Sequence, residues 1–226
     1  MTARVFCSGR DGRIQRMTAS QISMEGAMEG ESGLGTEMEL QRRLLLATAT
    51  DTVRGLSFHN MLDAVRLELG DEAMARCQAQ CVETSFKSFF TYPVSDYLRL
   101  QYTAAWMLQE KYGSFDNAVR RMSSGLAPGF LSSVVGKAFM LLTKEGPRQL
   151  INNMPVAFRA AASFGELSVH WTGSRKGVLV TRRDFLLYLS HEGGLMGLFR
   201  TLGITTAVVR GRQVGPLDNE VEFSWE

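Results

Sequence analysis

The chain has 226 residues, of which 45% are hydrophobic and 21% charged, and its formal net charge is +2. These values are typical of a globular protein that can bury a core, and so small a net charge does not indicate nucleic acid or a membrane as a partner. No stretch approaches the roughly 18 apolar residues of a membrane-spanning helix. Three cysteines, an odd count, and no secretory signal predict a reducing cytoplasm as the location.

The first 43 residues are expected to form a flexible N-terminal tail. Residues 19–36 are rich in Gly, Ser, Glu and Met and show no hydrophobic periodicity, which is typical of chain that does not pack into a core. An Asp-Gly pair at residues 11–12 also permits a hairpin in this tail. A single α+β domain is expected to occupy residues 44–226.

Helical patterns extend from residue 60 to residue 153, after a β-branched stretch at residues 44–56 that is expected to be extended. The most apolar helix covers residues 96–112, where Arg99, Gln101 and Thr103 form only a narrow polar edge, so it is predicted to be buried. The other predicted helices cover residues 60–70, 71–82, 115–123, 129–144 and 147–153, with Gly125 and Pro155 as helix ends.

Beyond residue 165 the hydrophobic period changes from that of a helix to that of a strand. Residues 166–172 alternate between apolar and polar side chains, and residues 177–183 follow after a turn. A helix at 192–202 and strands at 205–213 and 220–225 complete the pattern. The predicted fold class is α+β, with an N-terminal helical layer followed by a ββαββ antiparallel sheet of about four strands.

Several segments of this chain resemble a known family in the same order from about Thr48 to Trp225. They include DTVRGLSFHNMLDAV, FFTYPVSDYLRLQYTAA, FLSSVVGKAFMLL, HEGGL and the closing VEFSW. The family is the large myxobacterial paralogous family of unknown function, from which no site residue carries over. The layout is similar, more remotely, to ligand-sensing domains of the haem–nitric-oxide-binding and 4-vinyl-reductase type, which implies a bacterial signalling role by analogy of fold.

This remote likeness raises the question of haem. Haem–nitric-oxide-binding proteins hold the propionates with Tyr-x-Ser-x-Arg and the iron with a histidine. Two segments, Tyr112–Asp116 and Tyr188–Glu192, have the tyrosine and the serine but carry a carboxylate in place of the arginine. The available histidines, His59, His170 and His191, are far apart in the sequence. We therefore expect no cofactor, and a haem-based gas sensor is the less favoured alternative.

Metal and catalytic sites are not expected either. Cys77 and Cys81 would supply only half of the roughly four ligands of a structural zinc ion, so they are interpreted as core thiols. Gly129, Gly136 and Lys137 do not have the spacing of a phosphate-binding loop. No combination of nucleophile, base and acid can be recognised, which predicts that the protein is not an enzyme.

Two features could bind an anion. His191, Gly193 and Gly194 are expected to begin a helix, where free backbone N–H groups attract negative charge, although these glycines could instead allow close packing of the helix on the sheet. Arg183, Arg210 and Arg212, together with Arg182, would form a basic patch if their strands are neighbours. The alternative is an ordinary solvated sheet face.

The favoured function is a non-enzymatic cytoplasmic sensory or small-molecule-binding domain. A pocket for a small apolar or amphipathic ligand is expected between the helical layer and the sheet, lined by Phe89, Phe90, Tyr97, Trp106 and Phe130. The alternative is a protein-interaction or structural module that acts by dimerisation or by docking on a protein partner. An exposed apolar patch would favour that alternative, and neither a membrane nor nucleic acid is expected as a partner.

Overall fold

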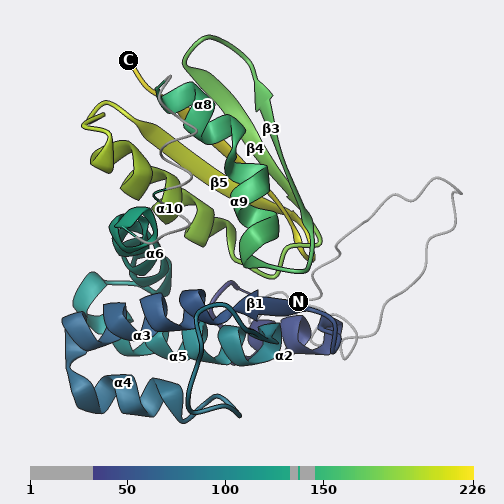
Figure 1. Ribbon diagram of the computed structural model, residues 1–226, viewed down its shortest axis with the longest axis vertical. Coiled ribbons are helices and arrows are strands. Elements are labelled where there is room, and N and C mark those ends of the chain that lie inside the picture. The colour runs from purple at the N-terminus through teal and green to yellow at the C-terminus, as the bar shows by residue number, and fades with distance from the viewer. Residues whose placement is uncertain (1–32, 133–136, 138–145) are drawn as a thin grey trace, which may run out of the picture.

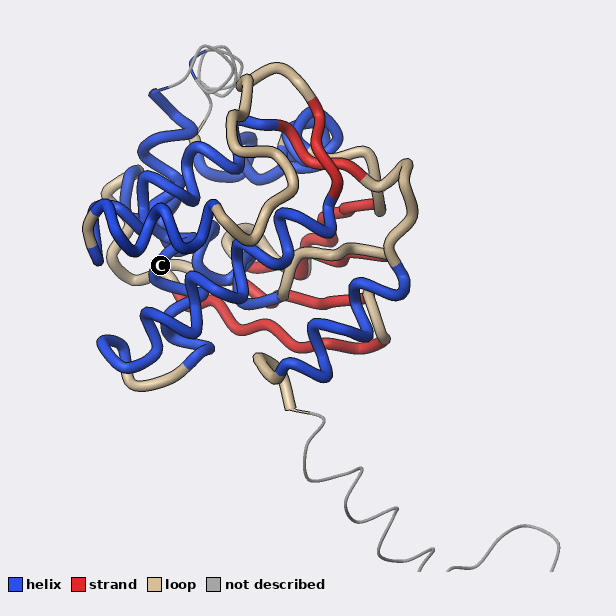
Figure 2. Tube along the Cα trace, turned by 90° about the horizontal axis from the view of Figure 1, so that it is seen from below, coloured by secondary structure: helices blue, strands red, loops and turns tan. Residues whose placement is uncertain are grey.

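Figure 1 shows the computed structural model, which describes residues 33–132, 137 and 146–226. The chain forms a helical layer and a sheet layer, and the helices of the first lie in front of the sheet when the molecule is viewed from below (Figure 2). The helical layer consists of α2 (Glu37–Leu46), β1 (Thr52–Arg54), α3 (Gly55–Leu69), α4 (Asp71–Gln78), β2 (Thr91–Pro93) and α5 (Val94–Tyr112). Helix α6 (Phe115–Ser132) leads from this layer to the sheet layer and packs against α10 (Tyr188–Thr201).

The sheet layer has four antiparallel strands in the order β3-β4-β6-β5. Its elements are α8 (Pro147–Asn152), α9 (Met154–Ala161), β3 (Glu166–Trp171), β4 (Lys176–Arg182), α10, β5 (Val208–Gly215) and β6 (Asp218–Ser224). Alternate residues such as Leu179 and Val221, which are register partners, are fully buried on the inner face, whereas His170 and Glu222 are exposed on the other. The prediction of an α+β fold with a four-stranded antiparallel sheet is confirmed.

The N-terminal helix α2 lies in a segment that was expected to be a tail. Thr36 caps this helix by accepting a hydrogen bond from the Glu39 N–H through its side chain. Glu39, Leu40 and Arg43 are all buried. The expectation of a flexible tail is therefore wrong for residues 37–43, while residues 1–32 lie outside the described part of the chain.

Helix boundaries differ from the prediction where tertiary contacts override local signals. Helix α3 begins at Gly55 because its first N–H groups bond to the carbonyl oxygens of Phe90 and Ser88. Helix α6 continues through Gly125 and Pro128, so the prediction of a helix end there is wrong. Pro155 lies in the first turn of α9 and does not simply end α8. Proline is favoured in a first turn because the N–H groups there have no partner within the helix.

Asp51 joins the two layers. Its carboxylate is buried in the turn before β1 and accepts hydrogen bonds from Arg183 Nη1 at 2.7 Å and Nη2 at 2.9 Å. The Thr48 N–H and hydroxyl donate to Oδ2, both at 2.8 Å. The hydrogen bond from Arg183 is the main reason that the pKa of Asp51 is about 2, below its ordinary value of 3.8. The turn before β1 is thereby tied to the residue that follows β4.

We expect Asp51→Asn to lower the free energy of unfolding by about 1–2 kcal/mol at pH 7, because Arg183 is about half exposed and its pair is partly screened. A carboxyl whose pKa is depressed in the folded state stabilises the protein above its unfolded pKa and loses this contribution as the pH falls through the folded value. The difference between wild type and variant should therefore shrink between about pH 4 and pH 2. Urea unfolding of both proteins at pH 7 and pH 3 measures this difference in the free energy of unfolding. A difference that does not change with pH would contradict the role given to the Asp51–Arg183 pair.

Candidate functional site

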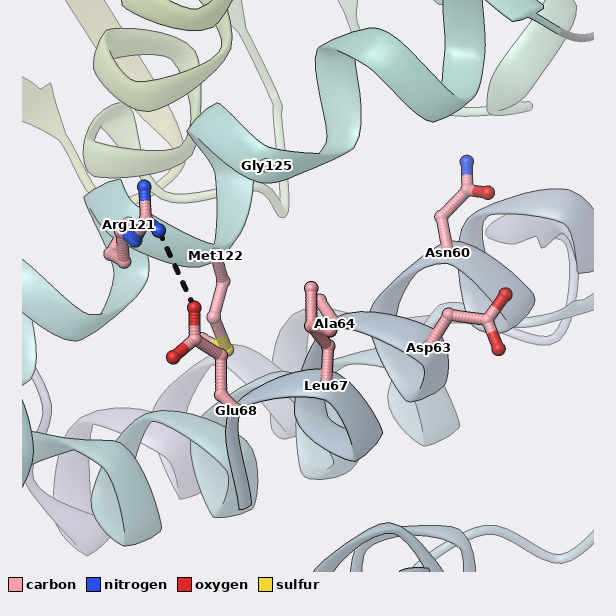
Figure 3. Close-up of a pocket in the computed structure, with 8 residues that line it drawn as sticks. All are labelled: Asn60, Asp63, Ala64, Leu67, Glu68, Arg121, Met122 and Gly125. Atoms are coloured by element: carbon pink, nitrogen blue, oxygen red, sulfur yellow. Dashed lines mark ion pairs between the residues drawn. The ribbon is translucent and has the colours of Figure 1, made fainter. Parts of the chain in front are cut away.

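A groove runs between helices α3 and α6 of the described chain (Figure 3). Its volume is about 230 Å³, and it is partly open to solvent. The lining residues are Asn60, Asp63, Ala64, Leu67, Glu68, Arg121, Met122 and Gly125. Helix α3 turns Met61, Leu62 and Val65 into the core, which leaves the polar and small residues of its other faces beside α6.

One end of the groove is positively charged. Arg121 Nη2 lies 3.5 Å from Glu68 Oε1, and Glu68 Oε2 also accepts hydrogen bonds from Lys111 Nζ at 2.7 Å and from the Tyr112 hydroxyl at 2.5 Å. The Lys111 hydrogen bond, followed by that of Tyr112, lowers the pKa of Glu68. Two cations thus neutralise one ionised carboxylate, and Arg121 is left with N–H groups that a ligand could use.

The opposite end of the groove carries the Asp63 carboxylate and the Asn60 amide (Figure 3). Leu67, Ala64 and Met122 separate the two polar ends. A Cβ atom added to Gly125 would meet nothing within 4 Å, which means that this glycine leaves open space over the groove. The arrangement could hold a small molecule with an apolar body and charged ends. The sequence analysis did not predict this groove, because polar residues on one helix face cannot be distinguished in a sequence from an ordinary solvated surface.

The five pocket residues expected from the sequence do not line this groove. Phe89 and Phe90 are 72% and 61% exposed on the segment before β2. Tyr97 is buried against Phe58, with ring centroids 5.3 Å apart, and Trp106 is half-buried and donates through Nε1 to the Gly35 carbonyl oxygen at 2.6 Å. The Phe130 side chain lies outside the described residues. The structure therefore does not bring the described members together around one ligand.

The helix that was expected to offer free amides begins earlier than predicted. Because α10 starts at Tyr188, residues 191–194 lie inside it, where N–H groups bond to the preceding turn. A Cβ atom on Gly193 would overlap the Arg120 carbonyl oxygen of α6. Gly193 thus serves close packing of α10 on helix α6, whereas the alternative interpretation expected close packing on the sheet. His191 Nε2 is paired with the buried Asp184 Oδ2 at 2.6 Å. The anion-site prediction for His191, Gly193 and Gly194 is wrong.

The predicted basic patch does not form either. Strands β4 and β5 are not neighbours, because the acidic strand β6 lies between them. Arg212 Nη2 lies 2.6 Å from Glu220 Oε2, and Arg210 is the register partner of Glu222. Arg183 is paired with Asp51. The arginine charges are therefore compensated by carboxylates of the protein itself.

The described residues contain no cluster of three or more His, Cys, Asp or Glu side chains that could hold a metal ion. Cys77 and Cys81 are free and buried. Burial raises the pKa of Cys77 to about 11 and that of Cys81 to about 12. Both thiols are therefore protonated and unreactive near neutral pH.

Comparison with known proteins identifies a family for this chain. A family model described as "Protein of unknown function (DUF2378)" matches residues 46–226. The chain belongs to this family. Most of helix α2 precedes the region that the family model matches. A comparison with curated proteins finds no match.

Solved structures of H-NOX proteins share the fold at low sequence identity. The Fe(II) unliganded H-NOX protein from K. algicida has a TM-score of 0.62 and 14% identity, and the match covers 76% of this chain and 96% of that one. An H-NOX protein from S. oneidensis in the Fe(II)NO ligation state has a TM-score of 0.61 and 11% identity, with 76% and 99% covered. An oxygen-binding H-NOX domain related to soluble guanylate cyclases has a TM-score of 0.58 and 10% identity, covering 76% and 95%. At these identities the likeness shows the fold.

The described side chains do not fit a haem. Ser114 Oγ accepts a hydrogen bond from the Asn117 N–H, and Ser190 Oγ accepts one from Gln101 Nε2. Glu192 is buried and is bound by Arg120 Nε at 2.5 Å and by the Gly211 N–H. Glu192 and, in the other segment, Asp116 are carboxylates at the position where an arginine would be needed. A carboxylate there repels a propionate, and neither segment supplies a cation in its place.

The three histidines do not converge on one site. His59 packs edge-on against Phe86, His170 lies on the exposed sheet face beside Ser168, and the ring of His191 is bound to Asp184.

We expect the protein to be colourless when it is expressed with a haem precursor. The physical reason is that each Tyr-x-Ser-x-acid segment places a carboxylate, Asp116 or Glu192, where a cation would be needed to pair with a haem carboxylate. An absorption spectrum across the Soret region, with elemental analysis for iron and zinc, provides the measurement. A Soret band near one haem per chain that is lost in His191→Ala or His59→Ala would contradict this expectation.

Proposed function

We propose that this chain is a non-enzymatic sensory domain that binds a small molecule and acts in the cytoplasm. The observation that carries the proposal is the shared fold with H-NOX proteins over nearly their whole length. One of those proteins is described in an Fe(II)NO ligation state and another as an oxygen complex. Because Asp116 and Glu192 stand where a haem propionate would need an arginine, the proposed ligand of this chain is a different small molecule.

The α3–α6 groove supports this proposal as the ligand site. Its volume of about 230 Å³ is slightly below the roughly 300–1,000 Å³ of typical small-molecule pockets, so the ligand would be small. The Arg121 end attracts an anionic group and the Asp63 end a cationic group, while Leu67 and Met122 contact the apolar body. A small amphipathic molecule with separated charges fits this distribution.

The chemistry of the described side chains supports a binding role over catalysis. General acid–base or nucleophilic catalysis needs two or more reactive groups within hydrogen-bond reach. His191 is committed to Asp184 inside the protein, and the two buried thiols are protonated. Within the described part of the chain, the groove contains neither a histidine nor a cysteine.

Native mass spectrometry of the freshly purified full chain tests the proposal. We expect an adduct of small mass on the wild type and its loss in Ala64→Trp, because an indole at Ala64 would fill the groove. Ala75→Trp is the matched control, since Ala75 is exposed on α4 and lies outside the groove. An adduct that is still present in Ala64→Trp would exclude this groove as the ligand site. A wild-type protein without any adduct would count against a ligand that copurifies with the chain.

A docking module is the second candidate function. The observation that favours it is the pair Phe89 and Phe90, whose rings are largely exposed at adjacent positions. Adjacent exposed aromatic residues are typical of interaction surfaces.

A further inference from the structure

The segment that carries Phe89 and Phe90 is held rigidly. It joins α4 to β2 across the helical layer (Figure 1). Phe86 is buried and stacks on Phe58 with ring centroids 4.3 Å apart. The Lys87 N–H donates to the Tyr92 hydroxyl at 2.7 Å, and the Phe90 N–H donates to the Lys87 carbonyl oxygen at 3.0 Å. Residues 87–90, which we call the aromatic loop, therefore have a defined backbone.

The start of α3 completes this anchoring. The Gly55 N–H donates to the Phe90 carbonyl oxygen at 2.8 Å, and Arg54 Nη1 donates to that of Phe89 at 2.5 Å. Gly55 permits the approach, since a Cβ atom there would overlap the Lys87 carbonyl oxygen. Anchoring on both sides fixes the backbone while both phenyl rings remain in solvent. Their exposure is therefore built into the fold and does not follow from a loose loop.

One cation lies in the aromatic loop, a second bonds to it, and a third is next to the second. Lys87 Nζ lies 5.2 Å from the centre of the Phe90 ring. Among the described residues, Arg54 bonds only to the backbone carbonyl oxygens of Phe89 and Ala160, which do not neutralise its charge. Arg159 is exposed near the end of α9 and precedes Ala160, the residue whose carbonyl oxygen Arg54 binds. No ion pair within 4 Å joins any of these three cations to a carboxylate of the described chain.

We propose that the aromatic loop, with Arg54 and Arg159, docks this protein onto an anionic lipid surface. A second copy of the chain is a poor occupant, because a twofold interface would bring like charges together. The phenyl rings project from the surface, and the acyl region of a bilayer accepts such rings without a matching cavity. Anionic headgroups complement the three cations.

This proposal revises the expectation that no membrane is a partner. That expectation rested on the small net charge of the whole chain and on the lack of a spanning segment. None of the described helices is long and apolar enough to cross a membrane. Peripheral docking needs no such segment. It combines shallow insertion of apolar rings with attraction of basic side chains to the surface.

Cosedimentation of the full chain with vesicles tests the proposal. One set of vesicles is pure phosphatidylcholine and the other contains phosphatidylserine. We expect binding to the second set to exceed binding to the first by about fivefold for each engaged cation. The preference should weaken when sodium chloride is raised from about 0.1 M to 0.5 M, because salt screens surface charge.

Two double variants separate the contributions. Phe89→Ser with Phe90→Ser should lower the partition coefficient about tenfold or more, and Lys87→Glu with Arg159→Glu should abolish the preference for phosphatidylserine. Val208→Ser with Val214→Ser is the matched control, because these exposed side chains lie on β5. Unchanged circular dichroism and melting temperature establish that each variant is folded.

The proposal is overturned if the wild type does not sediment with phosphatidylserine vesicles, or if the phenylalanine variant binds them as the wild type does. In either case a protein partner becomes the occupant to consider for the aromatic loop. Equal binding to both vesicle types would also overturn it, because the three cations would then have no part in the interaction.

Discussion

Replacing Arg43 with alanine is expected to lower the free energy of unfolding by about 3–5 kcal/mol. Arg43 is 2% exposed, and its Nε is paired with Glu39. Its Nη1 donates to the Phe185 carbonyl oxygen and its Nη2 to Gln213 Oε1, both at 3.3 Å. Without the guanidinium, the buried Glu39 carboxylate would retain, among the described residues, only the Tyr102 hydroxyl as a side-chain donor. Breaking a buried pair is costly because one uncompensated charge stays behind.

Urea unfolding of Arg43→Ala and Arg42→Ala measures this effect with a matched control. Arg42 is the exposed neighbour on α2, so its removal should change the free energy of unfolding by less than about 0.5 kcal/mol. The double variant Glu39→Gln with Arg43→Met should be less destabilised than Arg43→Ala, since no charge remains buried. Equal stability of the two arginine-to-alanine variants would show that α2 does not depend on this ion pair.

Phe58→Ala is expected to cost about 3–5 kcal/mol, the usual range for removal of a buried aromatic side chain. Phe58 is 0% exposed and contacts the rings of Phe86, Tyr97 and Tyr92, at centroid distances of 4.3, 5.3 and 5.7 Å. Its removal would leave a cavity where α3 meets α5 and would release the stacking partner of Phe86.

Phe90→Ala is the control for Phe58→Ala, because it removes the same side chain from the surface of the same region. We expect a change within about 0.5 kcal/mol for Phe90→Ala. Thermal and urea unfolding provide the comparison. A loss for Phe58→Ala as small as that for Phe90→Ala would place the aromatic cluster outside the stability-determining core.

The distribution of apolar residues predicted the elements whose buried positions are apolar. The strand pattern at residues 166–172 and the apolar helix at 96–112 were correct because their buried positions are mostly apolar. Helix α2 was missed because two of its buried positions are Glu39 and Arg43, and buried charges look like a solvated surface in a sequence. Strand order could not be predicted either, because no local signal says that β6 lies between β4 and β5.

The candidate sites were less predictable than the fold. Phe89 and Phe90 were assigned to an interior pocket because large apolar residues are usually buried. Their exposure depends on backbone contacts from Arg54 and Gly55, which no pattern in residues 85–93 reveals. The α3–α6 groove combines residues from two helices that are distant in sequence. Polar residues of α3 such as Asp63 can be recognised as part of a ligand site only when the position of α6 is known.

The contacts between the two layers have a consequence for the order of folding. Asp51 binds Arg183, and Arg43 binds Gln213, so the N-terminal helix and the turn after it are completed by residues near the other end of the chain. During synthesis the contact between Arg43 and Gln213 cannot form until strand β5 has left the ribosome. Closing such long loops before their contacts form slows folding. We therefore expect α2 to dock late, after the sheet has formed, with the buried charges of Glu39 and Arg43 hydrated until then.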